Sequence, residues 1–147
     1  MRVLTSLNMR ILQLHCDHIE YTPTKKEIQS AEDIENPQTR RLEDLVVVFV
    51  AMENGDDSSV AQNALSQIKA SMEKIGCKKL LLYPYAHLSS NLAKPSIAMS
   101  LLKEMEDSSS ELEVSHSPFG WTKSYKIQVK GHPLAESFKV VTKDSQN

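Results

Sequence analysis

The sequence has few of the residues that mark secreted or membrane proteins. It contains two cysteines among 147 residues, too few for a disulfide framework or a four-cysteine zinc site. A reduced, cytoplasmic setting fits that count best. The longest apolar run, residues 45–52, is far shorter than the roughly 20 residues that span a bilayer. The start has no apolar stretch of signal-peptide length, so we expect neither secretion nor a membrane anchor.

The chain also lacks an excess of positive charge. Its net charge of −2 excludes nucleic-acid binding by bulk charge alone. Residues 1–122 carry 12 Lys and Arg against 17 Asp and Glu, whereas residues 123–147 carry five lysines against two acidic residues. A polyanionic partner is therefore expected to meet the C-terminal quarter, although solvated strands often show a similar imbalance.

Composition and length indicate one globular domain. Hydrophobic residues make up 40% and charged residues 24% of the chain, which is typical of a folded protein. The apolar pattern begins at Met9, so residues 1–8 are interpreted as a leader and residues 9–143 as the domain. Residues 144–147 are polar and linker-like, which slightly favours a segment cut from a longer protein.

Alternating and β-branched apolar runs predict about six strands. Residues 11–14 and 19–21 predict a first strand and its return strand, and residues 23–41, which are polar and contain two prolines, predict a long loop. The run at 45–50 predicts a buried central strand. Further strands are expected at 79–83, near 112–114, at 125–129 and at 138–141.

Two amphipathic helices are expected between these strands. Apolar residues recur at helical spacing from Val60 to Ile75, Ser58 and Ser59 offer N-caps, and Gly76 suits the C-terminal cap. Pro95 suits the first turn of a second helix. The inner face of this second helix is predicted to hold Ile97, Ala98, Leu101, Leu102 and Met105. The sum is an α/β domain: a single layer of mixed sheet covered by two helices.

Two segments combine features that a hydrophobic core does not require. Residues 83–95 (YPYAHLSSNLAKP) lie between a predicted strand and a helix N-terminus, where α/β folds place ligands. The second region runs through Pro-Phe-Gly at 118–120 to Lys-Gly-His-Pro-Leu-Ala-Glu at 130–136. It offers the single tryptophan, a lysine at a turn and a carboxylate.

These motifs, with the opening residues 9–21, closely resemble the N-terminal editing domain of archaeal threonyl-tRNA synthetase. The resemblance covers residues 9–141. It implies a fold similar to D-aminoacyl-tRNA deacylase, a homodimer, and hydrolysis of the ester in mischarged L-seryl-tRNA(Thr), with the rest of the synthetase following. Threonine differs from serine by one methyl, so a synthetic site rejects serine by only ~1–3 kcal/mol and a second, hydrolytic site is needed.

The resemblance also implies roles for particular residues. Lys123 would position the attacking water or stabilise an oxyanion, and His87, grouped with it as catalytic, would contact the terminal adenosine or the substrate. Glu136 would bind the substrate's α-amino group or orient the lysine. Thr122 stands where some family members have tyrosine, so it offers a hydroxyl with a shorter reach. Further substrate-binding positions are Met52, Pro84, Ala86 and Phe119.

Other chemistries are less favoured by the residues. His15, Cys16, Asp17 and His18 would point alternately to opposite faces of a strand, so no metal site is expected, and no cofactor is implied. Ser89 and Ser90 lie near His87 but outside a nucleophile-elbow motif. Two further functions stay open: a D-aminoacyl-tRNA deacylase, and a non-catalytic module that binds the tRNA 3′ end or mediates dimerisation.

Overall fold

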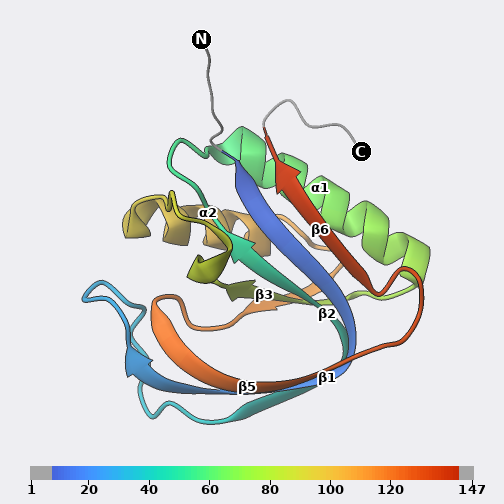
Figure 1. Cartoon of the computed structure of the whole chain (residues 1–147), viewed down its shortest axis with the longest axis horizontal. Coiled ribbons are helices and arrows are strands. Elements are labelled where there is room, and N and C mark those ends of the chain that lie inside the picture. Colours follow the sequence, from blue (N-terminus) through green and yellow to red (C-terminus); the bar gives the residue numbers. More distant parts are fainter. Residues whose placement is uncertain (1–7, 143–147) are drawn as a thin grey trace.

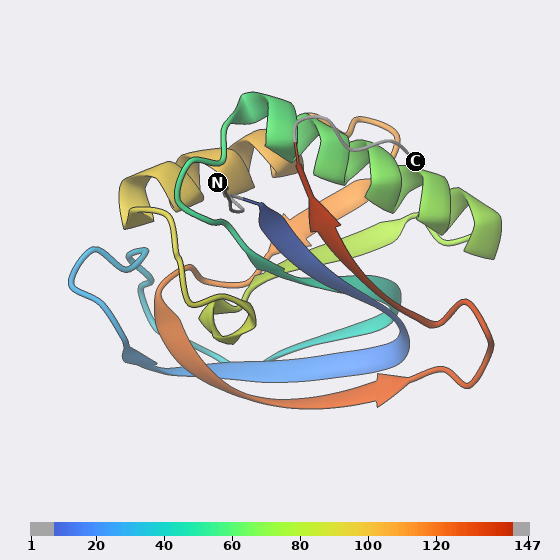
Figure 2. The ribbon, with the colours of Figure 1, turned by 45° about the horizontal axis from the view of Figure 1, so that its top comes forward.

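A computed structural model describes residues 8–142. Its six-stranded sheet has the order β4-β3-β2-β1-β5, with β6 also paired to β1. The strands are β1 (Met9–Lys26), β2 (Arg40–Ala51), β3 (Lys79–Pro84), β4 (Glu113–His116), β5 (Trp121–Val129) and β6 (Glu136–Val141). Two helices, α1 (Ser58–Ile75) and α2 (Pro95–Asp107), cover one face of the sheet (Figures 1 and 2). The prediction of a mixed sheet layer with two helices is confirmed. The leader, apart from Asn8, and the tail at 144–147 lie outside the described residues.

The two parallel pairings explain why the helices share one face. Strands β2 and β3 are parallel, as are β3 and β4, so each connection must cross over the sheet, and right-handed crossovers place both helices on the same side. Strand β1 is antiparallel to β2, β5 and β6. This arrangement brings the carboxyl ends of β2 and β3 together beside the start of α2.

The prediction of two strands within residues 11–21 was wrong, because β1 is one strand of 18 residues. It pairs with β2 along one edge, while its other edge pairs first with β6 and then with β5. The register shifts between Cys16 and His18, which is a bulge that bends the strand without ending it. The same strand extends into the predicted loop at 23–41, which is shortened to residues 27–39.

Both predicted helices are present, with two corrections at residue level. The N-cap of α1 is Asp57, whose carboxylate accepts from the Val60 N–H at 3.1 Å, so neither Ser58 nor Ser59 caps the helix. Gly76 closes α1 at φ 72° as expected. In α2, Ile97 is 42% exposed and does not belong to the inner face, whereas the other four predicted residues are buried.

The sheet is apolar on both faces. Alternate residues of β2 point to the helices (Val46, Val48, Val50) or to the opposite face (Leu45, Val47, Phe49). On that opposite face β5 curves across the sheet, and the Tyr125 ring lies 5.8 Å from the Phe49 ring and 5.5 Å from the Tyr83 ring, centroid to centroid. The chain therefore uses its scarce aromatic residues mainly beneath the carboxyl ends of the parallel strands.

Candidate active site

A cavity of about 260 Å³ lies at the carboxyl ends of β2 and β3, beside the start of α2. Residues of three connections line it: the loop between β1 and β2, the segment that follows β3, and the turn before β5. Figure 2 shows the backbones of these connections at one end of the sheet. Strand ends and a helix N-terminus are the usual place for ligands in sheets of this kind. Seven of the eight predicted site residues line this cavity: Met52, Pro84, Ala86, His87, Phe119, Thr122 and Lys123.

Lys123 is held near the start of β5 by backbone carbonyls. Its Nζ donates to the Pro118 oxygen at 2.8 Å and to the Trp121 oxygen at 3.1 Å. The same atom lies 4.8 Å from the centroid of the Tyr83 ring, a distance at which a cation is attracted to an aromatic face. A lysine ammonium has three donors, so these carbonyls leave one for a water or substrate oxygen.

Burial changes the acidity of this lysine. Loss of hydration lowers the pKa of Lys123 to about 8, although the negative charge of Glu32 opposes the change. The ammonium therefore predominates at pH 7 and can stabilise a developing oxyanion. Above pH 8 the neutral amine predominates and can accept a proton from water. Lys123 can thus stabilise an oxyanion or act as a base within about one pH unit of pH 8.

His87 lies opposite, on the short 3-10 helix η1 (Ala86–Leu88). Its ring is 5.3 Å from the Tyr85 ring, in an edge-on contact, and the side chain is exposed. The Tyr85 N–H donates to the Val50 oxygen at 2.9 Å, which fixes this segment to the end of β2. The histidine is therefore an exposed imidazole on an anchored loop, positioned to meet a ligand that enters from solvent.

The other lining residues differ in their exposure. Met52 is 4% exposed and forms the floor at the end of β2, while Phe119 is half-buried and packs against the core on the helix side. Thr122 is exposed, and its carbonyl accepts from the Thr24 hydroxyl at 3.0 Å. The cavity thus has an apolar floor and a polar rim.

Glu136 is the predicted residue that does not line the cavity. It begins β6 opposite Leu14, in the half of β1 that precedes the bulge, and its side chain is exposed. Within one copy of the chain, the structure does not bring it to Lys123. Its role in substrate binding stays a prediction.

Sequence reasoning missed several residues that shape the cavity. Tyr83 lies directly beneath Lys123, and burial raises the pKa of its phenol well above the usual value, so it stays neutral. Glu27 and Ile28 reach the cavity from the predicted loop. Trp121 fixes that loop, since its indole N–H donates to the Glu32 carbonyl at 2.7 Å. Tyr83 ends the apolar run of β3, which is a local signal, whereas no local pattern points to the loop.

The alternative chemistries find little support in the described residues. Among residues 8–142 there is no group of three or more metal-ligating side chains. His15 instead pairs with His132, with 2.8 Å between Nδ1 and Nε2. The Ser89 hydroxyl donates to the carboxylate of Glu53, which is 2% exposed. Ser89 is therefore an anchor of the loop that carries His87.

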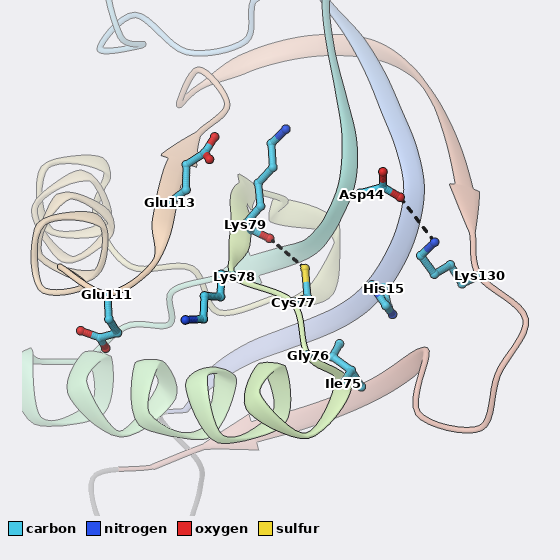
Figure 3. A pocket seen from close by; sticks show the side chains of 10 residues that line it. All are labelled: His15, Asp44, Ile75, Gly76, Cys77, Lys78, Lys79, Glu111, Glu113 and Lys130. Carbon is cyan, nitrogen blue, oxygen red and sulfur yellow. Dashed lines mark hydrogen bonds and ion pairs between the residues drawn. The ribbon is translucent and has the colours of Figure 1, made fainter.

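A second, more open hollow of about 560 Å³ lies at the opposite end of the sheet (Figure 3). It is bounded by the end of α1 and contains none of the predicted site residues. Two of its lysines are engaged: Lys130 contacts Asp44 at 3.6 Å, and the Lys79 ammonium donates to the Glu43 carbonyl at 3.2 Å. A third, Lys78, is exposed, unlike the half-buried Lys123 of the first cavity.

Comparison with known proteins agrees with the geometry. A family model described as the archaea-specific editing domain of threonyl-tRNA synthetase matches residues 9–141. The chain belongs to this family. It is therefore an aminoacyl-tRNA editing domain, a class of ester hydrolase. None of the helices within residues 8–142 is long and apolar enough to cross a membrane.

Relatives of this editing domain are named threonine–tRNA ligase. The protein of Nitrosopumilus maritimus is 85% identical over 93% of this chain, and that of Cenarchaeum symbiosum is 60% identical over 94%. The protein of Nanoarchaeum equitans is 40% identical over 90%. The chain spans about a fifth of the length of these relatives, 22% in each case.

Solved structures share the fold at low sequence identity. One described as a probable eukaryotic D-amino acid tRNA deacylase has a TM-score of 0.64 at 10% identity, covering 90% of this chain and 99% of that one. Another, described as a c-Myc DNA unwinding element binding protein, has a TM-score of 0.65 at 7% identity, covering 88% and 97%. The expected D-aminoacyl-tRNA deacylase-like fold is confirmed.

Proposed function

We propose that this editing domain hydrolyses the ester of L-seryl-tRNA(Thr) and releases serine and tRNA(Thr). The observation that carries the proposal is that seven of the predicted site residues, Lys123 among them, line one cavity at the ends of β2 and β3. Family membership supports the reaction class. The need for a second sieve explains the substrate, because one missing methyl is worth only ~1–3 kcal/mol in a synthetic site.

In the proposed mechanism the tRNA 3′ end enters beside His87 and Phe119. The remaining Nζ–H of Lys123 holds the attacking water or the carbonyl oxygen, on which negative charge develops as water adds. Backbone N–H groups and the ribose hydroxyl beside the ester supply the further hydrogen bonds, and no metal or cofactor takes part. The bond from the carbonyl carbon to the ribose oxygen then breaks, and that oxygen takes up the proton that the attacking water has released, so serine and tRNA(Thr) leave.

The proposal extends to the partners and the setting of the domain. We infer that the tRNA(Thr) 3′ end is presented by the remainder of a threonyl-tRNA synthetase, since this chain aligns with only 22% of the length of the named relatives. A homodimer and a cytoplasmic location complete the proposal. In this view Glu136 binds the α-amino group of serine or orients Lys123, as the family resemblance implies.

The deciding experiment compares hydrolysis of L-seryl-tRNA(Thr) and L-threonyl-tRNA(Thr) by this chain. Rapid loss of serine with threonine spared is expected. Lys123→Ala should lower the rate by roughly 10²–10³-fold, as expected when an oxyanion contact is lost. Lys103→Ala is the matched control, because Lys103 is an exposed lysine on α2 outside the cavity, and it should leave the rate unchanged.

The alternatives give different results in the same assay. A D-aminoacyl-tRNA deacylase, the function suggested by the fold of the deacylase neighbour, would cleave D-aminoacyl-tRNA and spare L-seryl-tRNA. A non-catalytic module would bind the tRNA 3′ end without turnover. An undiminished rate in Lys123→Ala would remove this lysine from the mechanism.

A further inference from the structure

The turn that carries Lys123 is held by the loop between β1 and β2. The Glu32 N–H donates to the Phe119 carbonyl at 2.9 Å, and the Glu27 N–H donates to the Gly120 carbonyl at 2.8 Å. Gly120 has φ +80°, and a Cβ built there would lie 2.9 Å from Ala31, so the two segments are in direct contact. This loop is thus docked onto the turn rather than free in solvent.

Glu32 makes the central contacts of this docking. One carboxylate oxygen accepts from the Phe119 N–H at 3.0 Å, and its backbone carbonyl accepts from the Trp121 indole at 2.7 Å. Both carboxylate oxygens lie 3.0 Å from Nε2 of His116. His116 is held in turn by Glu106 of α2, with 2.7 Å between Nδ1 and the carboxylate oxygen. Glu32 therefore ties the turn to both β4 and α2.

These contacts bear directly on Lys123. Its two carbonyl acceptors belong to Pro118 and Trp121, the residues that flank the Phe119–Gly120 pair held by the loop. Fixing Phe119 and the Trp121 indole therefore fixes the two carbonyls that hold the ammonium. Glu32 also carries the negative charge that acts on Lys123 against the effect of burial.

We propose that Glu32 is a positioning residue of the candidate active site: it clamps the turn whose carbonyls hold the Lys123 ammonium and supplies the opposing charge. The inference rests on the proposed function only in treating Lys123 as a site residue. Glu32 does not line the cavity and touches no reacting atom. Its effect on hydrolysis passes through the geometry and protonation of Lys123.

Other ionisable groups lie near Lys123 and can also influence its pKa. Tyr83 lies beneath it, and the rings of Tyr85 and Tyr125 each contact the Tyr83 ring. Burial raises the pKa of the Tyr83 and Tyr125 phenols, which favours their neutral forms. The remaining charged or titratable neighbours are Glu27 and His87 at the cavity, and His116 and Glu106 behind Glu32.

Glu32→Gln tests the charge while keeping the shape. An amide oxygen can still accept from the Phe119 N–H, and both backbone contacts of residue 32 are unaffected. Asp33→Asn is the matched control: it is the next residue, loses the same charge, and pairs with Lys26 at 3.1 Å away from the cavity. The readout is the titration midpoint of Lys123, followed by ¹³C NMR of its Cε in this chain without tRNA.

Glu32→Gln is expected to lower the Lys123 midpoint by roughly 0.5–1 pH unit, as for an opposing charge removed at partial burial. Asp33→Asn should leave it unchanged. An unchanged midpoint in Glu32→Gln, with its melting temperature near that of the wild type, would overturn the proposal. An equal fall in both variants would do the same.

The hydrolysis assay gives the second arm. If L-seryl-tRNA(Thr) is cleaved, the limb of the pH–rate profile near pH 8 should move to lower pH in Glu32→Gln by the same amount as the midpoint. A residue that only stabilises the fold would lower the melting temperature and leave this limb in place. Because the midpoint is measured without tRNA, failure of the proposed hydrolysis and failure of this proposal are distinguishable.

Discussion

The burial of Lys123 sets function against stability at a single residue. Removing an ammonium from water costs free energy unless a counter-charge or hydrogen bonds offset it. Here two carbonyls and the Tyr83 ring replace part of the hydration, yet the pKa still falls from 10.5 to about 8. If Lys123 had only a structural role, the fold would be more stable with its ammonium in water.

Lys123→Met is therefore expected to stabilise the domain while lowering its hydrolysis rate as Lys123→Ala does. At pH 7 both states of the wild type bind the proton, and the native state bears the full cost of burial. Between pH 8 and 10.5 the unfolded state holds a proton that the native state has released, so wild-type stability rises with pH. The gain from Lys123→Met should be ~1–2 kcal/mol at pH 7, after the loss of two hydrogen bonds.

Urea unfolding at pH 7 and pH 10 measures this difference. The advantage of Lys123→Met over the wild type should shrink at the higher pH, because the wild-type lysine is then neutral in the native state. Lys103→Met, at an exposed position of α2, should show no such pH dependence. Equal or lower stability of Lys123→Met at pH 7 would contradict the cost assigned to burial.

At the scale of elements, the docking of the β1–β2 loop depends on one glycine. Gly120 and Gly76 both have positive φ, +80° and +72°, and each pays a similar backbone cost, ~1–2 kcal/mol, when replaced by alanine. Only at Gly120 would the new Cβ meet other atoms, at 2.9 Å from Ala31 Cα; at Gly76 nothing lies within 4 Å. Gly120→Ala must therefore push the loop and the turn apart.

Gly120→Ala should destabilise the domain by roughly 1–3 kcal/mol more than Gly76→Ala, as overpacking at a close contact usually does. Thermal unfolding of both variants checks the difference. Gly120→Ala should also lower the hydrolysis rate, since its turn carries Lys123. Gly76→Ala should leave the rate unchanged, because Gly76 lies at the end of α1 and does not line the cavity. Equal losses of stability in the two variants would contradict this prediction, because they would mean that the loop moves away from the new Cβ with no loss of free energy.

The same contrast explains what could be predicted from the sequence. Helices α1 and α2 and strands β2 and β3 were predictable because their apolar periods are local. The continuity of β1 was not predictable, since a bulge at Cys16–His18 breaks the alternation. The same edge of β1 nevertheless pairs with β6 before the bulge and with β5 after it. The sequence does not single out Asp57 as the cap of α1, because Ser58 and Ser59 beside it are also good capping residues.

For the site, long motifs contain six of the seven predicted residues that line the cavity, all but Met52, but they give no sign of its long-range supports. Glu32 contacts a turn 87 residues away, and polar loop residues carry no periodic signal for such a pairing. Glu136 was predicted from a motif alone, and its distance from the cavity depends on which half of β1 pairs with β6. Such relations arise from tertiary pairing, so local patterns cannot reveal them.

At the scale of the whole molecule, charge pairing narrows the surface available to tRNA. The sequence points to a basic C-terminal quarter, but Lys130 is paired with Asp17 at 2.6 Å and lies 3.6 Å from Asp44. Lys123 donates to two carbonyls. Lys94 and Lys126 are exposed, and each is next in sequence to a residue that lines the cavity. Few phosphates can therefore be neutralised, in keeping with a net charge of −2.

Binding of tRNA is thus expected to depend only weakly on salt. With about two to three phosphate contacts, the slope of log K against log salt should be about −2. Lys94→Ala and Lys126→Ala should each make the slope shallower by ~1, whereas Lys130→Ala should leave it unchanged because its charge is already neutralised. Titrations of tRNA(Thr) into the chain between 50 and 300 mM KCl measure these slopes. A slope steeper than about −5 would contradict this prediction, because it would require contacts from many more cations than Lys94 and Lys126.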